Sequence, residues 1–191
     1  MKNTKVILAL LENDDREQFI LDNQWAFKYG AMMEFGERDD HVGEDGEIIS
    51  RETIEKCIDE PRNETYRIML DGKKVGGVIL KIDKETQHNE LEILFVSPEV
   101  HSKGIGYGAW QEIEKLHPET KVWETCTPYF EKRNIHFYIN KCGFHAVEFF
   151  CAYNVDPNAP KEEADEGPGE MLRFQKVMVG EHRQAKGALV R

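Results

Sequence analysis

Short segments in which apolar and polar side chains alternate are spread along this chain, and this two-residue period is typical of β-strands. The central example is Leu91–Val96, in which Leu91, Ile93 and Phe95 alternate with their neighbours. The same pattern, with flanking turn residues, predicts six further strands: Thr4–Leu11, Thr65–Leu70, Lys74–Ile82, Val122–Thr125, Phe144–Phe150 and Met171–Val179. We expect these segments to form the sheet on which the rest of the chain packs.

Between the strands, apolar residues recur every three or four positions, which predicts helices with one buried face. We expect four helices: about Asp15–Tyr29, one capped by Ser50 and ended by Pro61, Ile105–Leu116, and Asn134–Cys142. Asp14 with Glu17 is similar to a capping box for the first helix. Its core candidates are Phe19, Ile20, Trp25 and Phe27, and their uneven spacing leaves open a break in this helix.

Glycine positions indicate how the strands connect. Asp71-Gly72 is a strong hairpin signal between two strands, and Gly76-Gly77 inside the second strand indicates a bulge or a close approach of backbone. The strand at Val122 follows the Leu91 strand after a helix, which predicts a parallel pair with the usual right-handed crossover.

The composition is that of a globular domain and disfavours several classes of partner. The chain has 191 residues, 40% apolar and 32% charged, which is enough for one domain; we place it at 1–179, with a tail at 180–191. The net charge of −11 argues against nucleic acid or an anionic membrane as partner. The apolar run Val6–Leu11 is too short for a signal peptide or a membrane span. Four cysteines without Cys-x-x-Cys spacing predict reduced thiols and a cytoplasmic location.

A glycine-containing loop follows the Leu91 strand and opens the next helix. Ser97-Pro98 ends the strand, and His101-Ser102-Lys103-Gly104-Ile105-Gly106 leads into helical spacing. The first N–H groups of a helix have no partner within it and carry partial positive charge, so such a loop is suited to bind phosphate. Glycines without a Cβ let an anion approach the backbone.

Two other phosphate-binding loops fit this segment less well. A P-loop requires Gly-Lys-Ser/Thr after its second glycine, where this chain has Tyr107-Gly108. A dinucleotide-binding loop requires Gly-x-Gly-x-x-Gly directly after the strand and an acid about 20 residues on, a position that Glu124 holds. Here the third glycine comes too early and the loop begins well after the strand. A nucleotide-dependent oxidoreductase is therefore the weaker alternative.

The loop resembles the acyl-CoA loop of the GNAT N-acetyltransferase superfamily, which reads Arg/Gln-x-x-Gly-x-Gly/Ala after a strand and a short turn. Val96-Ser97-Pro98-Glu99 is followed by His101-x-x-Gly104-x-Gly106, with His101 in place of Arg or Gln. Tyr138 with Gly143-Phe144 is similar to the family's Tyr-x-x-x-Gly-Phe motif. Tyr138 stands five residues before Gly143 instead of four. Either the helix ends one residue late, or the tyrosine is rotated by about 100° around the axis.

The resemblance implies the GNAT fold of the α/β (α+β) class. This fold has a mixed, mostly antiparallel sheet of about seven strands, about four flanking helices and a splayed parallel pair in the middle. The family uses acetyl-CoA as co-substrate and needs no metal. The diphosphate would bind backbone N–H groups of the loop, and the pantetheine arm would lie between the splayed strands, on main-chain groups of Phe95 and Val96. The implied cofactor-binding residues are Phe95, Val96, His101, Ser102, Lys103, Gly104, Ile105, Gly106, Tyr107 and Asn134.

Acetyl transfer to an amine requires a base for the amine and a proton for the departing thiolate. Glu92 and Glu124 are the candidate bases, and for each the alternative is a strand carboxylate that faces solvent or pairs with a lysine. Tyr138 is the candidate acid, with a core aromatic as its alternative role. Asn134 is suited either to hydrogen-bond pantetheine or to cap its helix. An acyl-cysteine on Cys126 is a minor alternative, because no histidine at a telling spacing supports it.

We interpret the chain as an acetyl-CoA-dependent N-acetyltransferase that acts by direct transfer on a primary amine of a small molecule or peptide. A GNAT-fold module that binds acyl-CoA without turnover is the non-enzymatic alternative. The acidic stretch Glu34–Glu47 favours a cationic acceptor, unless it is simply a solvated loop. Asp156–Glu170 is expected to be a mobile loop. The identity of the acceptor is not encoded in a readable motif, and a homodimer stays open.

Overall fold

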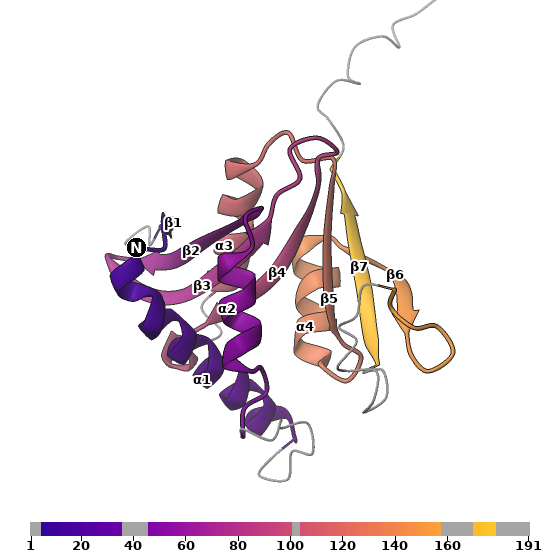
Figure 1. Ribbon diagram of the computed structural model, residues 1–191, viewed down its shortest axis with the longest axis horizontal. Coiled ribbons are helices and arrows are strands. Elements are labelled where there is room, and N and C mark those ends of the chain that lie inside the picture. The colour runs from indigo at the N-terminus through magenta and orange to yellow at the C-terminus, as the bar shows by residue number, and fades with distance from the viewer. Residues whose placement is uncertain (1–4, 36–45, 101–103, 158–169, 179–191) are drawn as a thin grey trace, which may run out of the picture.

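The computed structural model describes residues 5–35, 46–100, 104–157 and 170–178. These residues form one seven-stranded mixed sheet flanked by four helices, in the strand order β1-β2-β3-β4-β5-β7-β6 (Figure 1). The strands are β1 (Val6–Leu10), β2 (Asn63–Leu70), β3 (Lys73–Lys81), β4 (His88–Val96), β5 (Val122–Pro128), β6 (His145–Phe150) and β7 (Met171–Val177). The helices are α1 (Arg16–Phe35), α2 (Arg51–Asp59), α3 (Ile105–Leu116) and α4 (Lys132–His136). This architecture confirms the predicted fold class.

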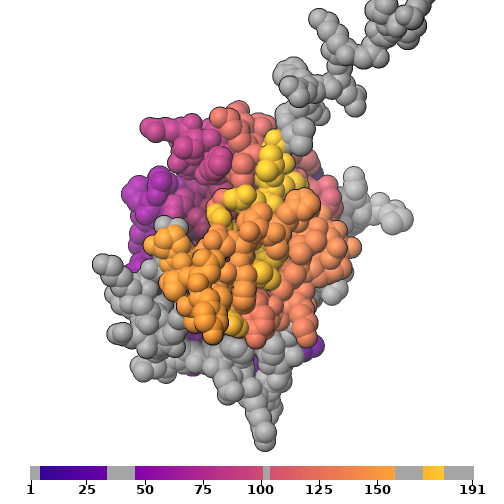
Figure 2. All heavy atoms as spheres, turned by 90° about the vertical axis from the view of Figure 1, so that its right-hand side faces the viewer, coloured from indigo at the N-terminus to yellow at the C-terminus, as the bar shows by residue number. Residues whose placement is uncertain are grey.

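Short helical turns accompany these elements. They are η1 (Asn13–Asp15), η2 (Pro98–Val100) and the π-helical η3 (Phe137–Cys142), which continues α4. The β6–β7 hairpin forms as predicted, and β7 lies between β5 and β6, so β6 is one of the two edge strands of the sheet. Figure 2 shows the molecule from this edge of the sheet, with β6 in orange beside β7 in yellow. The tail at 180–191 lies outside the described residues.

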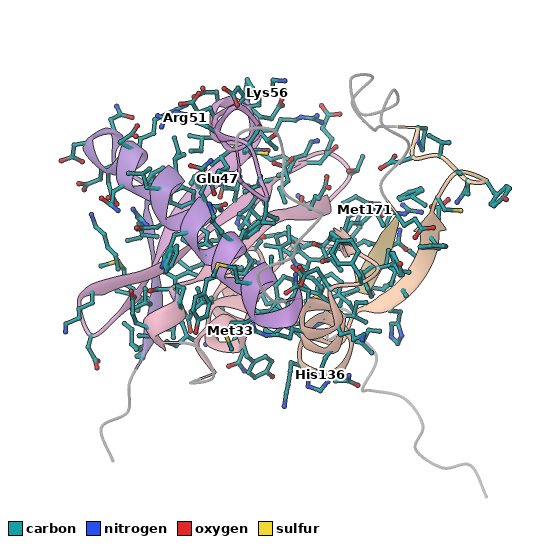
Figure 3. The ribbon with its side chains drawn as sticks, turned by 90° about the horizontal axis from the view of Figure 1, so that it is seen from below. Met33, Glu47, Arg51, Lys56, His136 and Met171 are labelled. Carbon is teal, nitrogen blue, oxygen red and sulfur yellow. The ribbon has the colours of Figure 1, made fainter. Side chains whose placement is uncertain are left out.

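The helices cover the sheet on both faces, and each face has its own core. Helices α1 and α2 lie on one face, and α3 and α4 lie on the other (Figure 1). In Figure 3, Arg51 and Lys56 of α2 lie on one side of the sheet and His136 of α4 on the opposite side. The core under α1 and α2 gathers Phe19, Ile20, Ile54, Ile79, Ile93 and Phe95. The opposite core gathers Leu91, Trp110, Trp123, Tyr138, Phe144 and Phe174.

An extra residue in β4 changes which face its side chains reach. Ile79 pairs with Ile93 and Leu80 pairs with Leu91, so Glu92 has no partner of its own on β3 and forms a bulge. Leu91 therefore packs in the core under α3, whereas Ile93 packs in the core under α1 and α2. The bulge makes β4 contribute to both cores.

The parallel pair β4–β5 is short and then separates. It holds three rungs, His88–Val122, Asn89–Trp123 and Glu90–Glu124. Beyond them the Thr125 hydroxyl donates a 2.9 Å hydrogen bond to the Leu91 carbonyl oxygen, and the ribbons then diverge (Figure 1). This divergence is the splayed pair that the family resemblance implies.

The hairpin and the double glycine behave as the sequence predicts. Asp71 and Gly72 both have positive φ, at 50° and 77°, in the turn between β2 and β3. A Cβ on Gly76 would lie 2.2 Å from the Phe95 carbonyl oxygen, and one on Gly77 would lie 2.3 Å from the Phe19 ring. The two glycines are therefore required for the close approach of β3 to β4 and α1.

The N-terminal helices differ from expectation in part. Helix α1 is unbroken to Phe35, and Trp25 on it is 49% exposed, so its placement in the core was wrong. The Asp14–Glu17 capping box is not formed, because Glu17 accepts a hydrogen bond from Arg51 at 2.9 Å instead. Ser50 caps α2 as predicted, since its hydroxyl accepts from the Thr53 N–H at 3.1 Å.

Candidate functional site

The gap between β4 and β5 presents main-chain groups of β4. The Ser97 N–H donates to the Val75 carbonyl oxygen on β3 at 2.8 Å. Successive residues of a strand direct their N–H and C=O groups to opposite neighbours, so residues 95 and 97 direct theirs to the same side. The N–H and C=O groups of Phe95 therefore point toward Gly77 on β3. Leu94 and Val96 direct theirs toward the gap. The β5 side of the gap is formed by the residues that follow Thr125.

The glycine loop ends in the first turn of α3 at the open end of this gap. Gly104 holds φ +74°, a left-handed conformation that a residue with a Cβ adopts at a cost. The first hydrogen bond of the helix runs from Gly108 N–H to the Gly104 carbonyl oxygen at 2.9 Å. The N–H groups of Ile105, Gly106 and Tyr107 therefore have no acceptor within the helix and are suited to bind an anion.

The three loop residues that precede this turn, His101, Ser102 and Lys103, lie outside the described residues. The side chain of Ile105 is buried with Ile68, Val75 and Ala109, so only its main chain is available to a ligand. A Cβ on Gly106 would meet Phe137 of η3 at 3.5 Å and Val96 of β4 at 3.8 Å, which are ordinary contacts. Gly106 thus lies where α3, η3 and β4 converge.

Asn134 lies within α4 and faces β5. Its side-chain amide donates to the Thr127 hydroxyl at 3.3 Å, and Thr127 is buried near the end of β5. The residue before the helix is Glu131, so the alternative in which Asn134 caps this helix is wrong. The Asn134 amide is thus held beside the gap on the α4 side.

A π-helix accommodates the extra residue between Tyr138 and Gly143. The segment η3 is π-helical throughout, and Gly143 ends it at φ +78°. A π-helix hydrogen-bonds each residue to the fifth one along, which matches the five-residue spacing. The helix therefore ends one residue late, the first of the two alternatives that the sequence left open.

The Tyr138 hydroxyl reaches the point where β4 and β5 separate. It hydrogen-bonds Thr125, which itself donates to the Leu91 carbonyl oxygen. The ring packs against Phe144 and Phe174 at centroid distances of 5.7 and 5.8 Å. Burial raises the pKa of Tyr138 to about 12, which keeps its proton on the hydroxyl. The phenol therefore has a proton available at neutral pH, and its raised pKa makes it a weaker acid than an exposed tyrosine.

Three glutamates gather on the α1/α2 face at the start of the divergence: Glu90, Glu92 and Glu124. Glu124 hydrogen-bonds Gln175 and lies 3.5 Å from Arg173 of β7. Glu92 accepts a 2.6 Å hydrogen bond from the Asn63 amide. Both predicted bases are thus present at the site, and both are already bound by neighbouring side chains.

Glu90 lies between the other two glutamates, and no sequence pattern singles it out. Burial and the charge of Glu92 raise the pKa of Glu90, while Lys81 opposes this shift. Its position could have been found only from the pairing of β4, because Glu90 is the last residue of β4 in a β5 rung. A hollow of about 140 Å³ beside it is lined by Arg62, Lys81, Asp83, His88, Asn89 and Glu124.

A larger hollow and a cysteine near the gap are weaker candidates for the functional site. The hollow of about 470 Å³ between 61–64 and 82–85 includes no residue of β5 or of the glycine loop. Burial raises the pKa of the Cys126 thiol to about 12, so the thiol stays protonated at neutral pH. This disfavours the acyl-cysteine alternative, which requires a thiolate nucleophile.

The residues that the structure describes offer neither a metal site nor a membrane-spanning helix. Among them, no group of three or more His, Cys, Asp or Glu side chains is arranged to hold a metal ion. Within the same ranges, no helix is long and apolar enough to span a bilayer.

The parallel strands β4 and β5 separate and open onto the glycine-capped start of α3, an arrangement that points to a known protein family. Residues 23–144 match the model of the acetyltransferase (GNAT) family, and the chain belongs to that family. The chain is 42% identical over 179 residues to the uncharacterized protein YrkN of Bacillus subtilis, and the alignment covers 91% of this chain and 94% of that protein.

Solved structures with low sequence identity share the fold. A PaiA N-acetyltransferase from Thermoplasma acidophilum in complex with coenzyme A has a TM-score of 0.63 at 18% identity, over 91% of this chain and 99% of that one. A spermidine N-acetyltransferase from Vibrio cholerae in complex with CoA and spermine has a TM-score of 0.62 at 14% identity, over 91% and 95%. These likenesses establish the GNAT fold.

Proposed function

We propose that this protein is an acetyl-CoA-dependent N-acetyltransferase that moves the acetyl group directly to a primary amine. One observation carries the proposal: β4 and β5 separate after three rungs, and the gap opens onto the glycine-capped start of α3. Family membership and the coenzyme present in related structures support the same interpretation.

The coenzyme would bind through main-chain groups. Its diphosphate lies on the N–H groups of Ile105, Gly106 and Tyr107, with the loop residues His101, Ser102, Lys103 and Gly104 completing the cradle. The pantetheine arm pairs with Leu94 and Val96, as an added strand does at a sheet edge. Phe95 does not contact the arm, because its main chain is directed to β3 and its side chain is buried against Phe19 at a ring-centroid distance of 5.1 Å. The Asn134 amide faces the arm from the α4 side.

The reaction needs two proton transfers. A carboxylate of the Glu90, Glu92 and Glu124 group takes a proton from the acceptor ammonium, and the neutral amine attacks the thioester carbonyl. The tetrahedral intermediate collapses with cleavage of the C–S bond. The Tyr138 hydroxyl protonates the leaving thiolate and regains its proton as the second amine proton is released. Because no acyl-enzyme forms, Cys126 has no covalent role.

We assign the acceptor to the class of small-molecule or peptide amines that carry positive charge. The acceptor face of the site holds three glutamates, and the chain has a net charge of −11. The related Vibrio cholerae structure holds spermine. The acidic stretch Glu34–Glu47 would add to this attraction, although 36–45 lies outside the described residues. We place the protein in the cytoplasm, where its four free cysteines stay reduced.

The test is an acetyl-CoA turnover assay with detection of the released thiol over a panel of polyamines, aminoglycosides and peptide N-termini. We expect thiol release that depends on an amine, together with a rise in Tm when CoA is added. A Tm rise with CoA but no release on any amine would favour the non-catalytic binding module. A Tm rise with NAD in place of CoA would contradict the proposal.

A further inference from the structure

The helical segment that carries Tyr138 depends on support from the rest of the fold. All of η3, Phe137–Cys142, is π-helical, a form that is rare and occurs mostly as a single turn within an α-helix. A change of one residue in helical register turns a side chain by about 100° around the axis. The contacts that keep η3 in the π-helical register therefore also decide whether the Tyr138 hydroxyl lies at the gap.

The C-terminal end of η3 closes on the main chain of Tyr138. The Tyr138 carbonyl oxygen accepts from the Gly143 N–H and, at 2.9 Å, from the Phe144 N–H. The second bond spans six residues and encloses a left-handed glycine, as in a Schellman motif. The carbonyl of Cys142, the last residue of η3, has no donor within the helix. Because Cys142 is only 2% exposed, this carbonyl needs a donor from elsewhere in the protein.

Lys176 of β7 supplies that donor. Its ammonium donates to the Cys142 carbonyl oxygen at 2.6 Å and to a Glu114 carboxylate oxygen on α3, and it lies 5.4 Å from the centroid of the Trp110 ring. The side chain is 21% exposed. A hydrogen bond from a charged donor is about twice as strong as one between neutral groups. Lys176 thus ties the end of η3 to both β7 and α3.

Strand β7 also holds Tyr138 at a second point. Phe174 precedes Lys176 by two residues, so both side chains lie on the face under α3 and α4. Phe174 packs on the Tyr138 ring at a centroid distance of 5.8 Å. One residue of β7 therefore contacts the tyrosine ring, and the next residue on that face holds the end of its helix.

We propose that Lys176 is a positioning residue for Tyr138: by holding the last carbonyl of η3, its ammonium keeps the helical register that directs the phenol to Thr125 and the gap. This inference rests on the proposed N-acetyltransferase function, in which Tyr138 protonates the leaving thiolate. Lys176 acts through Tyr138 alone and transfers no proton itself. Without its ammonium, the last turn frays or changes register, and the Tyr138 hydroxyl is displaced from the gap.

The first test is a double-mutant cycle on kcat. Lys176→Met removes the ammonium, keeps a side chain of similar length over Trp110, and should lower kcat by about 10-fold, part of the contribution of a general acid. Tyr138→Phe should lower kcat by about 100-fold. Because Lys176 acts through Tyr138, adding Lys176→Met to Tyr138→Phe should lower kcat by less than about 2-fold further. Losses that multiply in the double variant would overturn the inference.

Matched variants separate positioning from a general loss of structure. Lys176 contacts α3 near the C-terminal end of that helix, so Lys176→Met should leave KM for acetyl-CoA unchanged. Lys176→Arg keeps a cation that can donate to the same carbonyl and should recover most of kcat. Glu114→Gln, which spares the bond to Cys142, and Lys115→Met, at an exposed position on α3, should both keep most of kcat. A loss in Glu114→Gln as large as that in Lys176→Met would assign the effect to α3 and overturn the inference.

The second test requires neither acceptor nor turnover. Hydrogen exchange followed by NMR measures the protection of the Gly143 and Phe144 N–H groups, which close η3 on the Tyr138 carbonyl. In Lys176→Met both should exchange at least about 10-fold faster, while the N–H groups of β3 keep their wild-type rates. Lys115→Met should leave all of these rates unchanged. Unchanged protection of Gly143 and Phe144 in Lys176→Met, or an equal rise in rate throughout the sheet, would refute the role of Lys176.

The two proposals fail in different ways. If the wild type transfers acetyl to no amine, the transferase proposal fails, while the exchange rates still decide whether Lys176 holds the end of η3. If the wild type is active and Lys176→Met keeps its kcat, the positioning role fails and the transferase proposal stands. A Tm rise with CoA in each variant shows that it folds.

Discussion

At the scale of single residues, two glycines control how closely β3 can pack. A Cβ at position 77 would lie 2.3 Å from Cε2 of Phe19 and 2.6 Å from Cε1 of Phe95. Phe19 and Phe95 are both buried and pack edge to face, so neither ring can move aside cheaply. Side chains of α1 and β4 together fill the space that a side chain at position 77 would need.

We expect Gly77→Ala to destabilise the protein by about 2 kcal/mol, the usual cost of overpacking a core. Gly30→Ala is the matched control, because Gly30 lies within α1 and no atom of the described residues lies within 4 Å of where its Cβ would be. That variant should gain up to about 1 kcal/mol from helix propensity. Urea unfolding measures both. A neutral Gly77→Ala would show that α1 is not seated against β3 as described.

A buried ion cluster ties α1 to β2. Arg67 is 2% exposed and donates to Asp15 at 2.7 Å and to Asp22 at 2.8 Å, while Lys74 lies 2.8 Å from Asp15. Burial alone would raise the pKa of Asp15, but the hydrogen bonds and charges of Arg67 and Lys74 outweigh it and lower the pKa. A lowered pKa means that this carboxylate stabilises the folded state at neutral pH.

The sign of this effect fixes a pH dependence. The stabilisation is complete above the ordinary aspartate pKa and is lost as the pH falls through the lower folded value, that is, below about pH 4. We expect Asp15→Asn to cost about 3 kcal/mol at pH 7, since it weakens a buried ion pair. The difference from wild type should shrink at pH 3. Asp14→Asn, at an exposed neighbour, should change little at either pH; equal losses at both pH values for Asp15→Asn would contradict the assignment.

At the scale of elements, two helical termini depend on left-handed glycines. Gly104 precedes α3 at φ +74°, and Gly143 follows η3 at φ +78°. Among the described residues neither position is crowded, because the nearest atoms to a Cβ at Gly143 lie 3.8 Å away and none lies within 4 Å at Gly104. Alanine at either site is therefore disfavoured by backbone conformation and not by space.

These two sites separate stability from coenzyme binding. Gly104→Ala and Gly143→Ala should each cost about 1 to 2 kcal/mol of stability, the usual penalty for a left-handed alanine. Only Gly104→Ala should also weaken CoA binding, because it shifts the N–H groups of Ile105, Gly106 and Tyr107. Isothermal titration with CoA measures this. Equal affinity in both variants would argue against the loop as the diphosphate site.

The elements also show where sequence patterns stop being informative. The strand at Leu91, the loop and α3 were predictable because each has its own period or turn residue. The bulge at Glu92 was not, since it depends on Leu80 pairing with Leu91 while Ile79 pairs with Ile93. Alternation along β4 indicates one buried face, yet Leu91 and Ile93 enter opposite cores. Glu90 was overlooked because its place in the last β4–β5 rung depends on the tertiary pairing.

Helix α1 illustrates a second limit. Trp25 looks like a core residue from composition, but it packs beside Tyr29 on the outer side at a ring distance of 6.0 Å and is half exposed. Apolar residues lie on both sides of this helix, so its periodicity is weak although the helix is continuous. Periodicity identifies a buried face only when the opposite face is polar.

At the scale of the whole molecule, the sheet separates two tasks. The face under α3 and α4 carries the glycine-capped start of α3, Asn134 and Tyr138, which would meet the coenzyme. The face under α1 and α2 carries the three glutamates, which would meet the acceptor. The gap between β4 and β5 joins the two faces, and the bulge at Glu92 lies on its border. The order of elements was predictable from sequence, whereas this division depends on the tertiary pairing.

The central claim is that coenzyme A binds in the gap between β4 and β5 with its diphosphate at the start of α3. A crystal structure of the protein with acetyl-CoA tests it most directly. We expect diphosphate oxygens within hydrogen-bonding distance of the Ile105, Gly106 and Tyr107 N–H groups and the thioester beside Glu90. Coenzyme bound elsewhere, or a gap closed by side chains while coenzyme is present, would contradict the account.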